Sequence, residues 1–269
     1  MPELPASVRL ALWTTHVSST GGRLEDAMRL ATPDVDHVAG DLDRLSLWRD
    51  LGEQALLVAL PAAGDLTGVP KAPAEAQGAA AAAGECVFVP GIGGMLVPTV
   101  STYGADATAA PAAAGGIGSR ARDGLDTGTR VDWAAYDSAP VPRHRVEALD
   151  TSQLERHLRE ELLTATEAFD AVGGQPFAGS AARDLADAAL GGAWGLPSGM
   201  PGRAARVIAL AGTVGQIVDV ALAAGDGALT ATDAGRRHAL LLRLQRSADR
   251  TLADATNAAC AVIAGWRPA

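Results

Sequence analysis

The chain has 269 residues, 48% of them hydrophobic, which is enough to bury a core without disulfides or a structural metal. With 31 acidic and 22 basic residues its net charge is -9, which disfavours nucleic acid and anionic membranes as partners unless positive charge is locally concentrated. The two cysteines, Cys86 and Cys260, lie in apolar runs typical of buried side chains rather than of a disulfide or a nucleophile.

Helical patterns come first along the chain. Apolar residues recur at helical spacing in residues 6–17, 22–32 and 41–51. Pro33 follows the second segment and Gly52 follows the third, and both residue types are common where helices end. We expect these three helices to cover a sheet.

Four strands are predicted next. Residues 54–60 and 85–90 are apolar on both faces, as buried strands are. Between them an Ala-rich helix at 74–83 is long enough for a crossover connection, so we expect the two strands to be parallel neighbours. Residues 95–103 read as the returning strand of a hairpin, and residues 129–137 alternate like an outer strand with one wet face.

The second half of the chain reads as helix. Residues 104–128 have almost no large apolar side chain and predict a loosely held loop. A long amphipathic helix follows, beginning at a capping box formed by Ser152 and Glu155. Further helices are predicted at 180–190, 203–224 and 232–265.

The predicted fold is α+β. Residues 1–150 are expected to form a small mixed four-stranded sheet with covering helices, packed on a C-terminal antiparallel helical bundle in residues 151–269. The connector between these regions is short, so the sequence is compatible with two domains or with one shared core.

A glycine rim is the first candidate site. If the strands at 54–60 and 85–90 are parallel, the loops that follow them meet at one sheet edge, where ligands of open α/β sheets bind. The polar groups there would be Asp65 and Thr67, with open backbone at Gly91, Gly93 and Gly94. The simpler interpretation is that both loops are ordinary turns, since glycine is common in the turns and loops of all proteins.

An acidic cluster with one imidazole is the second candidate, formed by Asp34, Asp36, His37, Asp41 and Asp43. These groups would suit a divalent cation or an acid and base pair, although the spacing does not match an EF-hand. We favour helix capping by Asp34, Asp36 and Asp41, because acidic residues satisfy free N–H groups where helices begin.

Enzyme and metal motifs are missing from the sequence. No histidine lies in a nucleophile elbow, a His-Glu-x-x-His pattern or a Cys-x-x-Cys setting, so we expect neither a metal nor a cofactor. His144 lies in the basic stretch 142–145, which would meet a phosphate or carboxylate but is more typical of a solvated connector.

An arginine stripe on the last helix is the third candidate. Arg236, Arg243, Arg246 and Arg250 fall within about one quarter of the helix circumference, opposite the apolar stripe. The stripe would bind an acidic partner or nucleic acid, but a solvated face or a dock onto the acidic first half is the simpler account, and nucleic acid is the least favoured use.

Several segments carry a resemblance to a known group of proteins. Residues 48–52, 57–61, 64–68 and 141–145 resemble a family from GC-rich actinobacteria to which no activity is assigned. The resemblance implies a cytoplasmic bacterial protein and transfers no catalytic residue. The N-terminus lacks the positive charge of a signal peptide, and no uncharged apolar stretch of about eighteen residues follows, so composition also predicts a cytoplasmic protein without a membrane partner.

Two functions are consistent with the sequence. The first is a non-catalytic binding or assembly protein, with a protein partner or a second copy of the chain on its helical half. The alternative is an enzyme for a small polar or phosphorylated substrate, with Asp65 and Thr67 at the strand ends and His144 as acid or base. An enzyme should bring the loops at 61–70 and 90–94 into one pocket that holds a group with a perturbed pKa.

Overall fold

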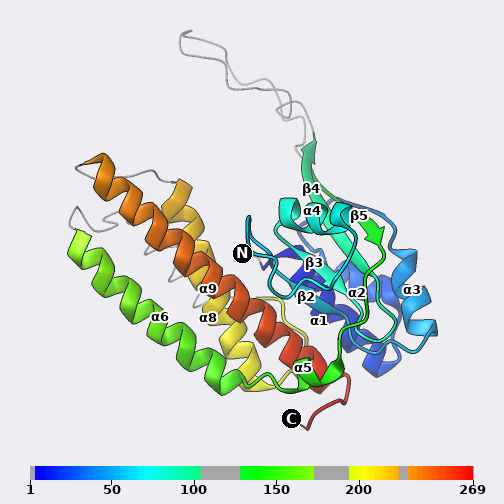
Figure 1. Ribbon diagram of the computed structural model, residues 1–269. Coiled ribbons are helices and arrows are strands. Elements are labelled where there is room, and N and C mark those ends of the chain that lie inside the picture. The colour runs from blue at the N-terminus through cyan, green and yellow to red at the C-terminus, as the bar shows by residue number, and fades with distance from the viewer. Residues whose placement is uncertain (1–3, 104–127, 173–193, 224–229, 269) are drawn as a thin grey trace, which may run out of the picture.

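The computed structural model describes residues 4–103, 128–172, 194–223 and 230–268 (Figure 1). Within these ranges the fold is α+β, with eight helices and one five-stranded mixed sheet, which confirms the predicted class. The helix predicted at 180–190 and nearly all of the loop predicted at 104–128 lie outside the described residues.

The sheet has the strand order β1-β5-β4-β3-β2. β1 is parallel to β5, and every other neighbouring pair is antiparallel. The strands are β1 (His37–Gly40), β2 (Leu57–Ala59), β3 (Cys86–Phe88), β4 (Met95–Tyr103) and β5 (Gly128–Tyr136).

The prediction of four strands was wrong by one. The additional strand, β1, is short and partly exposed, so it lacks the apolar pattern that reveals a buried strand. It pairs with the outer side of β5, which is therefore an inner strand and not the outer strand that was predicted.

The parallel arrangement predicted for β2 and β3 was also wrong. The two strands are antiparallel, with Leu57 opposite Phe88 and Ala59 opposite Cys86. The helix between them, α4 (Ala74–Ala83), has the predicted bounds, but a long connection permits a crossover without requiring one, and apolar residues on both faces do not encode strand direction. The loops after β2 and β3 therefore leave from opposite ends of the strand pair.

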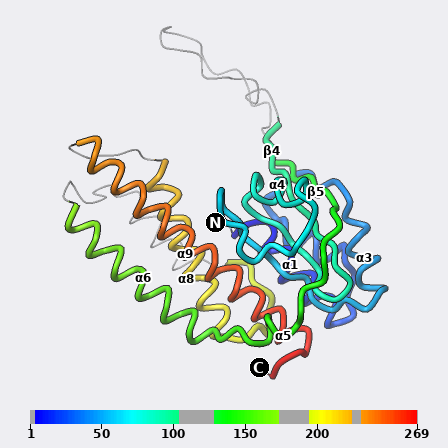
Figure 2. The backbone as a smooth tube through the Cα atoms, viewed as in Figure 1, coloured from blue at the N-terminus to red at the C-terminus, as the bar shows by residue number. Residues whose placement is uncertain are grey.

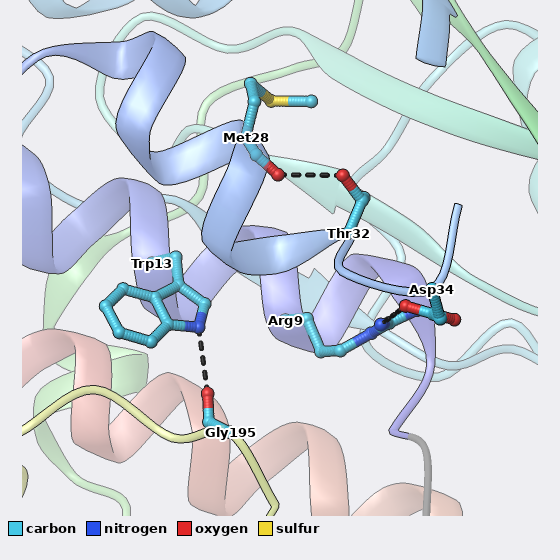
Figure 3. A network of polar contacts seen from close by, with 6 residues as sticks. All are labelled: Arg9, Trp13, Met28, Thr32, Asp34 and Gly195. Atoms are coloured by element: carbon cyan, nitrogen blue, oxygen red, sulfur yellow. Dashed lines mark hydrogen bonds and ion pairs between the residues drawn. The ribbon is translucent and has the colours of Figure 1, made fainter. Parts of the chain in front are cut away.

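Three helices precede β2, as predicted. They are α1 (Ala6–Thr20), α2 (Leu24–Ala31) and α3 (Asp43–Asp50), and α1 packs on β2, β3 and the last helix of the chain. Figure 3 shows two polar contacts of α1: an ion pair between Arg9 and Asp34, and a 2.9 Å hydrogen bond from Trp13 Nε1 to the Gly195 carbonyl. These contacts attach α1 to the segment before β1 and to the segment before α8.

The helical half consists of α5 (Arg143–Glu147), α6 (Thr151–Val172), α8 (Gly202–Ala223) and α9 (Ala231–Ile263) in the described residues. The three long helices pack on one another, with α6 and α8 running in one direction and α9 running back towards the sheet (Figure 2). Among the described helices, α8 alone is long and apolar enough to span a membrane, and 44% of its apolar window is buried within the structure.

The start of α6 differs from the predicted capping box. Asp150 precedes the helix, and its Oδ1 accepts from the Ser152 backbone N–H at 2.8 Å and from the Ser152 hydroxyl at 2.7 Å. Asp150 therefore caps the helix one residue before Thr151, and Ser152 serves as a donor to that cap.

One hydrophobic cluster joins the two halves of the chain. It contains Leu10, Leu57 and Val87 from the first half together with Ile208 and Leu252 from the second. A smaller cluster lies among α6, α8 and α9. The larger cluster fixes α8 and α9 against the β2 side of the sheet, which is where the candidate site lies.

Candidate functional site

The structure does not assemble the predicted glycine rim. Asp65 and Thr67 lie in the turn after β2, where Asp65 Oδ1 accepts from the Thr67 N–H at 3.0 Å. Gly91, Gly93 and Gly94 lie at the other end of the strand pair, in the turn between β3 and β4.

The β3–β4 glycine turn is closed by protein contacts. The Gly94 N–H donates to the Ser138 hydroxyl at 2.9 Å, and the Ile92 N–H donates to Glu53 Oε1 at 2.6 Å. Gly93 has a φ of 81°, and a Cβ added there would lie 2.1 Å from the Ser138 carbonyl oxygen. These glycines serve backbone packing, and no open cradle for an anion forms around them in the described residues.

The acidic cluster holds β1 in place. Asp36 Oδ2 accepts from the Thr129 N–H at 2.7 Å, and Asp41 Oδ2 accepts from the Ala135 N–H at 2.9 Å, so the two aspartates bracket β1. The prediction that they cap helices was wrong, because α3 begins after Leu42 with no side-chain cap. His37 and Asp43 are exposed, and the described residues contain no group of three potential metal-binding side chains.

The predicted arginine stripe divides among three environments. Arg243 pairs with Glu161 of α6 at 3.2 Å, and Arg250 pairs with Asp65 at 2.9 Å. Arg246 lines the cleft described below, whereas Arg236 is exposed near the start of α9. His144 is exposed on α5 and does not line that cleft.

A cleft of about 620 Å³ lies between the sheet and the helical half. One wall is the chain that leaves β2 together with Gly84 and Glu85, and the other walls are α8 and α9. Its polar side chains are Glu85, Gln216, Asp219, Gln245, Arg246 and Asp249. A smaller hollow of about 70 Å³ shares Arg246 and Asp249 with the cleft and extends to Asp65.

Glycine positions on α8 shape this cleft. A Cβ at Gly212 would lie 2.8 Å from Leu4 and 3.0 Å from Trp194, so this glycine permits close packing. A Cβ at Gly215 would meet no atom within 4 Å, because Gly215 faces the open space of the cleft. A side chain at Gly215 would therefore occupy the cleft without disturbing the packing around it.

Two aspartates that interact electrostatically line the cleft, Asp219 from α8 and Asp249 from α9. Burial, followed by the charge of Asp219, raises the pKa of Asp249 to about 7. Partial burial also raises the pKa of Asp219, whose Oδ1 accepts from Gln245 Nε2 at 2.6 Å. The Asp249 carboxyl has no hydrogen-bond or ion-pair partner within the described ranges. An unpaired carboxylate in such a wall is stabilised by a cation that enters the cleft.

Glu85 closes the cleft beside the start of α1. Its Oε2 accepts from the Ser7 backbone N–H at 2.7 Å, which satisfies a free donor in the first turn of a helix whose own N-cap is Pro5. Burial raises the pKa of Glu85, and the hydrogen bond from Ser7 opposes that shift. This carboxyl therefore has a structural partner, in contrast to Asp249.

The two aspartates of the cleft were not predicted as site residues from the sequence. Asp219 is the one acidic residue of the largely apolar helix α8, and Asp249 follows directly after the buried Ala248 of the last helix. A carboxylate next to an apolar helical stripe is an available signal, because such groups are rarely buried without a partner. Their approach depends on how α8 packs on α9, which spacing within either helix does not specify.

Two family models match the chain. The model described as Rv1486c-like protein, N-terminal domain, matches residues 7–148, and the model described as Rv1486c-like protein, C-terminal domain, matches residues 152–264. No curated protein and no solved structure matches the chain significantly. Since the N-terminal model alone covers more than half of the residues, the chain belongs to the Rv1486c-like protein family.

Proposed function

We propose that this protein binds a small, positively charged organic molecule in the cleft between β2, α8 and α9, without catalysing a reaction. The observation that carries the proposal is the Asp249 carboxyl, which lines the cleft beside Asp219 and has no partner among the described residues. A bound ammonium group would supply the missing counter-charge.

The composition of the cleft favours binding over catalysis. The described residues that line it include no histidine, cysteine, serine or lysine, so no serine, cysteine or lysine nucleophile and no histidine base is present among them. The balance of charge disfavours a phosphorylated substrate, because Asp219, Asp249 and Glu85 outnumber the single Arg246.

An enzyme remains the second candidate, and one observation favours it. A carboxyl with a pKa near 7 is suited to exchange a proton at neutral pH, and Asp249 has such a pKa. The substrate would still be the cationic molecule of the first proposal. Turnover of a bound ligand, followed by mass spectrometry, distinguishes this candidate from simple binding.

Assembly through the helical half has weaker support. Among the described residues of that half, Leu163 on α6 is the one large apolar side chain that is strongly exposed. The other exposed large apolar side chains lie in the first half, on several different elements. A single leucine does not make the contiguous apolar patch of several hundred Å² that a stable protein interface needs.

Calorimetric titration of the full chain tests the binding proposal. We expect 1,4-diaminobutane to bind and succinate, a dianion of similar length, not to bind. Asp249→Asn should weaken diamine binding about tenfold to a hundredfold, the value of a hydrogen bond to a charged group. Binding should tighten as pH rises through about 7, because the cation requires the ionised form of Asp249.

A filled cleft provides the matched control. Gly215→Leu should abolish diamine binding, whereas Gly235→Leu, at another helix glycine with open space around it, should leave binding unchanged. Equal binding by wild type and the Gly215 variant would place the diamine elsewhere and remove the proposal. Failure of the diamine to bind wild type at any pH above 7 would remove it as well.

A further inference from the structure

The outer edge of β2 is closed by side chains instead of by another strand. The backbone groups of Leu56 and Val58 bond to side chains of α1 and α9, so they point away from β3, and Leu60 is the next residue in this two-residue period. The Leu56 N–H donates to Thr15 Oγ1 of α1 at 3.0 Å. An edge strand is a template for further pairing wherever its backbone groups stay free.

Asn257 of α9 closes the next position along this edge. The Val58 N–H donates to Asn257 Oδ1 at 2.8 Å, and Asn257 Nδ2 donates to the Val58 carbonyl at 2.9 Å. A single carboxamide thus satisfies the donor and the acceptor of one strand residue. This pair shows the chemistry that the edge of β2 accepts.

The third position, Leu60, is open. No described residue accepts from the Leu60 N–H or donates to its carbonyl. Leu60 lines both the cleft and the adjoining hollow, beside Arg246 and Asp249. Continued by one residue beyond β2, the two-residue period of the strand turns the N–H and C=O of Leu60 to the same side as those of Val58. Val58, Leu60 and Asp249 all line the hollow on that side.

The open edge is one residue long. Pro61 has no backbone N–H, and the Ala62 N–H donates to the Asp65 carbonyl at 3.0 Å. An extended peptide would need several consecutive pairs to bind by strand addition, and this edge offers a single pair. One carboxamide group, placed as Asn257 is placed at Val58, satisfies it completely.

We infer that the ligand of the cleft carries a primary carboxamide, which pairs with the backbone of Leu60, together with an ammonium group that faces Asp249 and Asp219. This inference rests on the proposed function and adds the chemical class of the ligand. Charge complementarity places the ammonium near the aspartates, and the free strand edge places the amide.

A matched pair of ligands tests the inference on the unaltered protein. In 4-aminobutanamide an ammonium and a carboxamide are joined by a short chain, and in methyl 4-aminobutanoate the amide nitrogen is replaced by an ester oxygen. We expect the amide to bind at least about tenfold more tightly than the ester. The ester cannot donate a hydrogen bond to the Leu60 carbonyl and leaves that acceptor buried without a partner. In NMR titrations the Leu60 carbonyl carbon should shift with the amide and remain in place with the ester.

The remaining outcomes separate the two proposals. If 1,4-diaminobutane binds but the amide and the ester bind equally, the proposal of a carboxamide is overturned and the proposal of a cation-binding cleft is supported. If neither the diamine nor the amide binds, both proposals fall. If Nα-acetyl-lysine methylamide, a peptide residue with an ammonium, binds more tightly than 4-aminobutanamide, the edge accepts peptide and the assignment to a carboxamide is overturned.

Discussion

The carboxamide of Asn257 is bonded to both backbone groups of Val58, at 2.8 and 2.9 Å, although the two residues are 199 positions apart in the chain. The pair is buried, and it connects α9 to the outer edge of β2. One side chain therefore joins the helical half to the sheet and ends the sheet at β2, which would otherwise present free backbone groups to the core.

Removal of this carboxamide should destabilise the fold strongly. Asn257→Leu keeps the approximate volume but leaves the N–H and the C=O of Val58 buried without partners, at about 1–3 kcal/mol each. We expect urea unfolding to show a loss of about 2–5 kcal/mol. Thr256→Val is the matched control, because the neighbouring hydroxyl of Thr256 is buried with no hydrogen bond in the described structure, and its removal should be neutral or stabilising. Equal losses for the two variants would contradict the role of Asn257.

The Asp249 carboxyl should make stability depend on pH. Its folded pKa of about 7 lies above the ordinary value of 3.8, so between these values the folded protein retains a proton that the unfolded chain has released. Unfolding free energy should therefore fall as pH rises through this interval. At roughly 1.4 kcal/mol per unit, the largest effect of Asp249→Asn is a gain of about 4 kcal/mol above pH 7 and none below pH 4.

Measurement of this effect needs a control for other acids. Glu85 and Asp219 also line the cleft and titrate in both proteins, so the quantity to compare is the difference between wild type and variant at each pH. Asp170→Asn, which removes one exposed carboxyl of α6 that does not line the cleft, is the matched control. A difference for Asp249→Asn that is no larger than the difference for Asp170→Asn would show that Asp249 is not the group responsible.

Local elements of this fold are readable from the sequence. The bounds of α4 and β4 match the predicted 74–83 and 95–103. Neighbouring residues specify both elements: α4 is an Ala-rich run between Pro73 and Gly84, and β4 is an apolar strand that follows a glycine turn. The helices α8 and α9 agree with prediction to within two residues at each end for the same reason.

Long-range pairings were not readable from the sequence. The direction of β2 relative to β3 depends on the path of the chain that connects them. The segment His37–Gly40 forms a strand because it pairs with the outer side of β5. The cleft has the same origin, since Leu60, Glu85, Asp219 and Asp249 come from four separate segments. Arg246 and Asp65 were named from the sequence for an arginine stripe and for a glycine rim. The other residues that line the cavities beside them could not be inferred from spacing alone.

The β3–β4 glycine turn should be sensitive to added bulk at Gly93. Gly93 and Gly64 have nearly equal φ values, 81° and 80°, but an added Cβ meets the Ser138 carbonyl at Gly93 and nothing within 4 Å at Gly64. Gly64→Ala should cost about 1–2 kcal/mol of backbone strain. Gly93→Ala adds a backbone clash and should cost clearly more in the same unfolding experiment. Similar losses would show that strain alone governs both turns.

The arginines of α9 should not make this protein a nucleic-acid binder. Glu161 pairs with Arg243 and Asp65 pairs with Arg250, so Arg236 and Arg246 are the two arginines of the stripe that have no ion pair among the described residues. Log K falls with log salt by about 0.9 per neutralised phosphate. Fluorescence anisotropy with random duplex DNA should therefore give a slope whose magnitude is about 2 or less.

Removal of the acidic partners of Arg243 and Arg250 tests whether these arginines bind DNA when they are unpaired. The double variant Asp65→Asn with Glu161→Gln frees Arg250 and Arg243 on one face of α9, which should raise the salt slope by at most about 2. If wild type already shows a steep slope, positive charge elsewhere in the chain contacts DNA. If the double variant gains none, the two arginines are too far apart or too mobile to act together, and the stripe is a solvated helix face held to its neighbours by surface ion pairs.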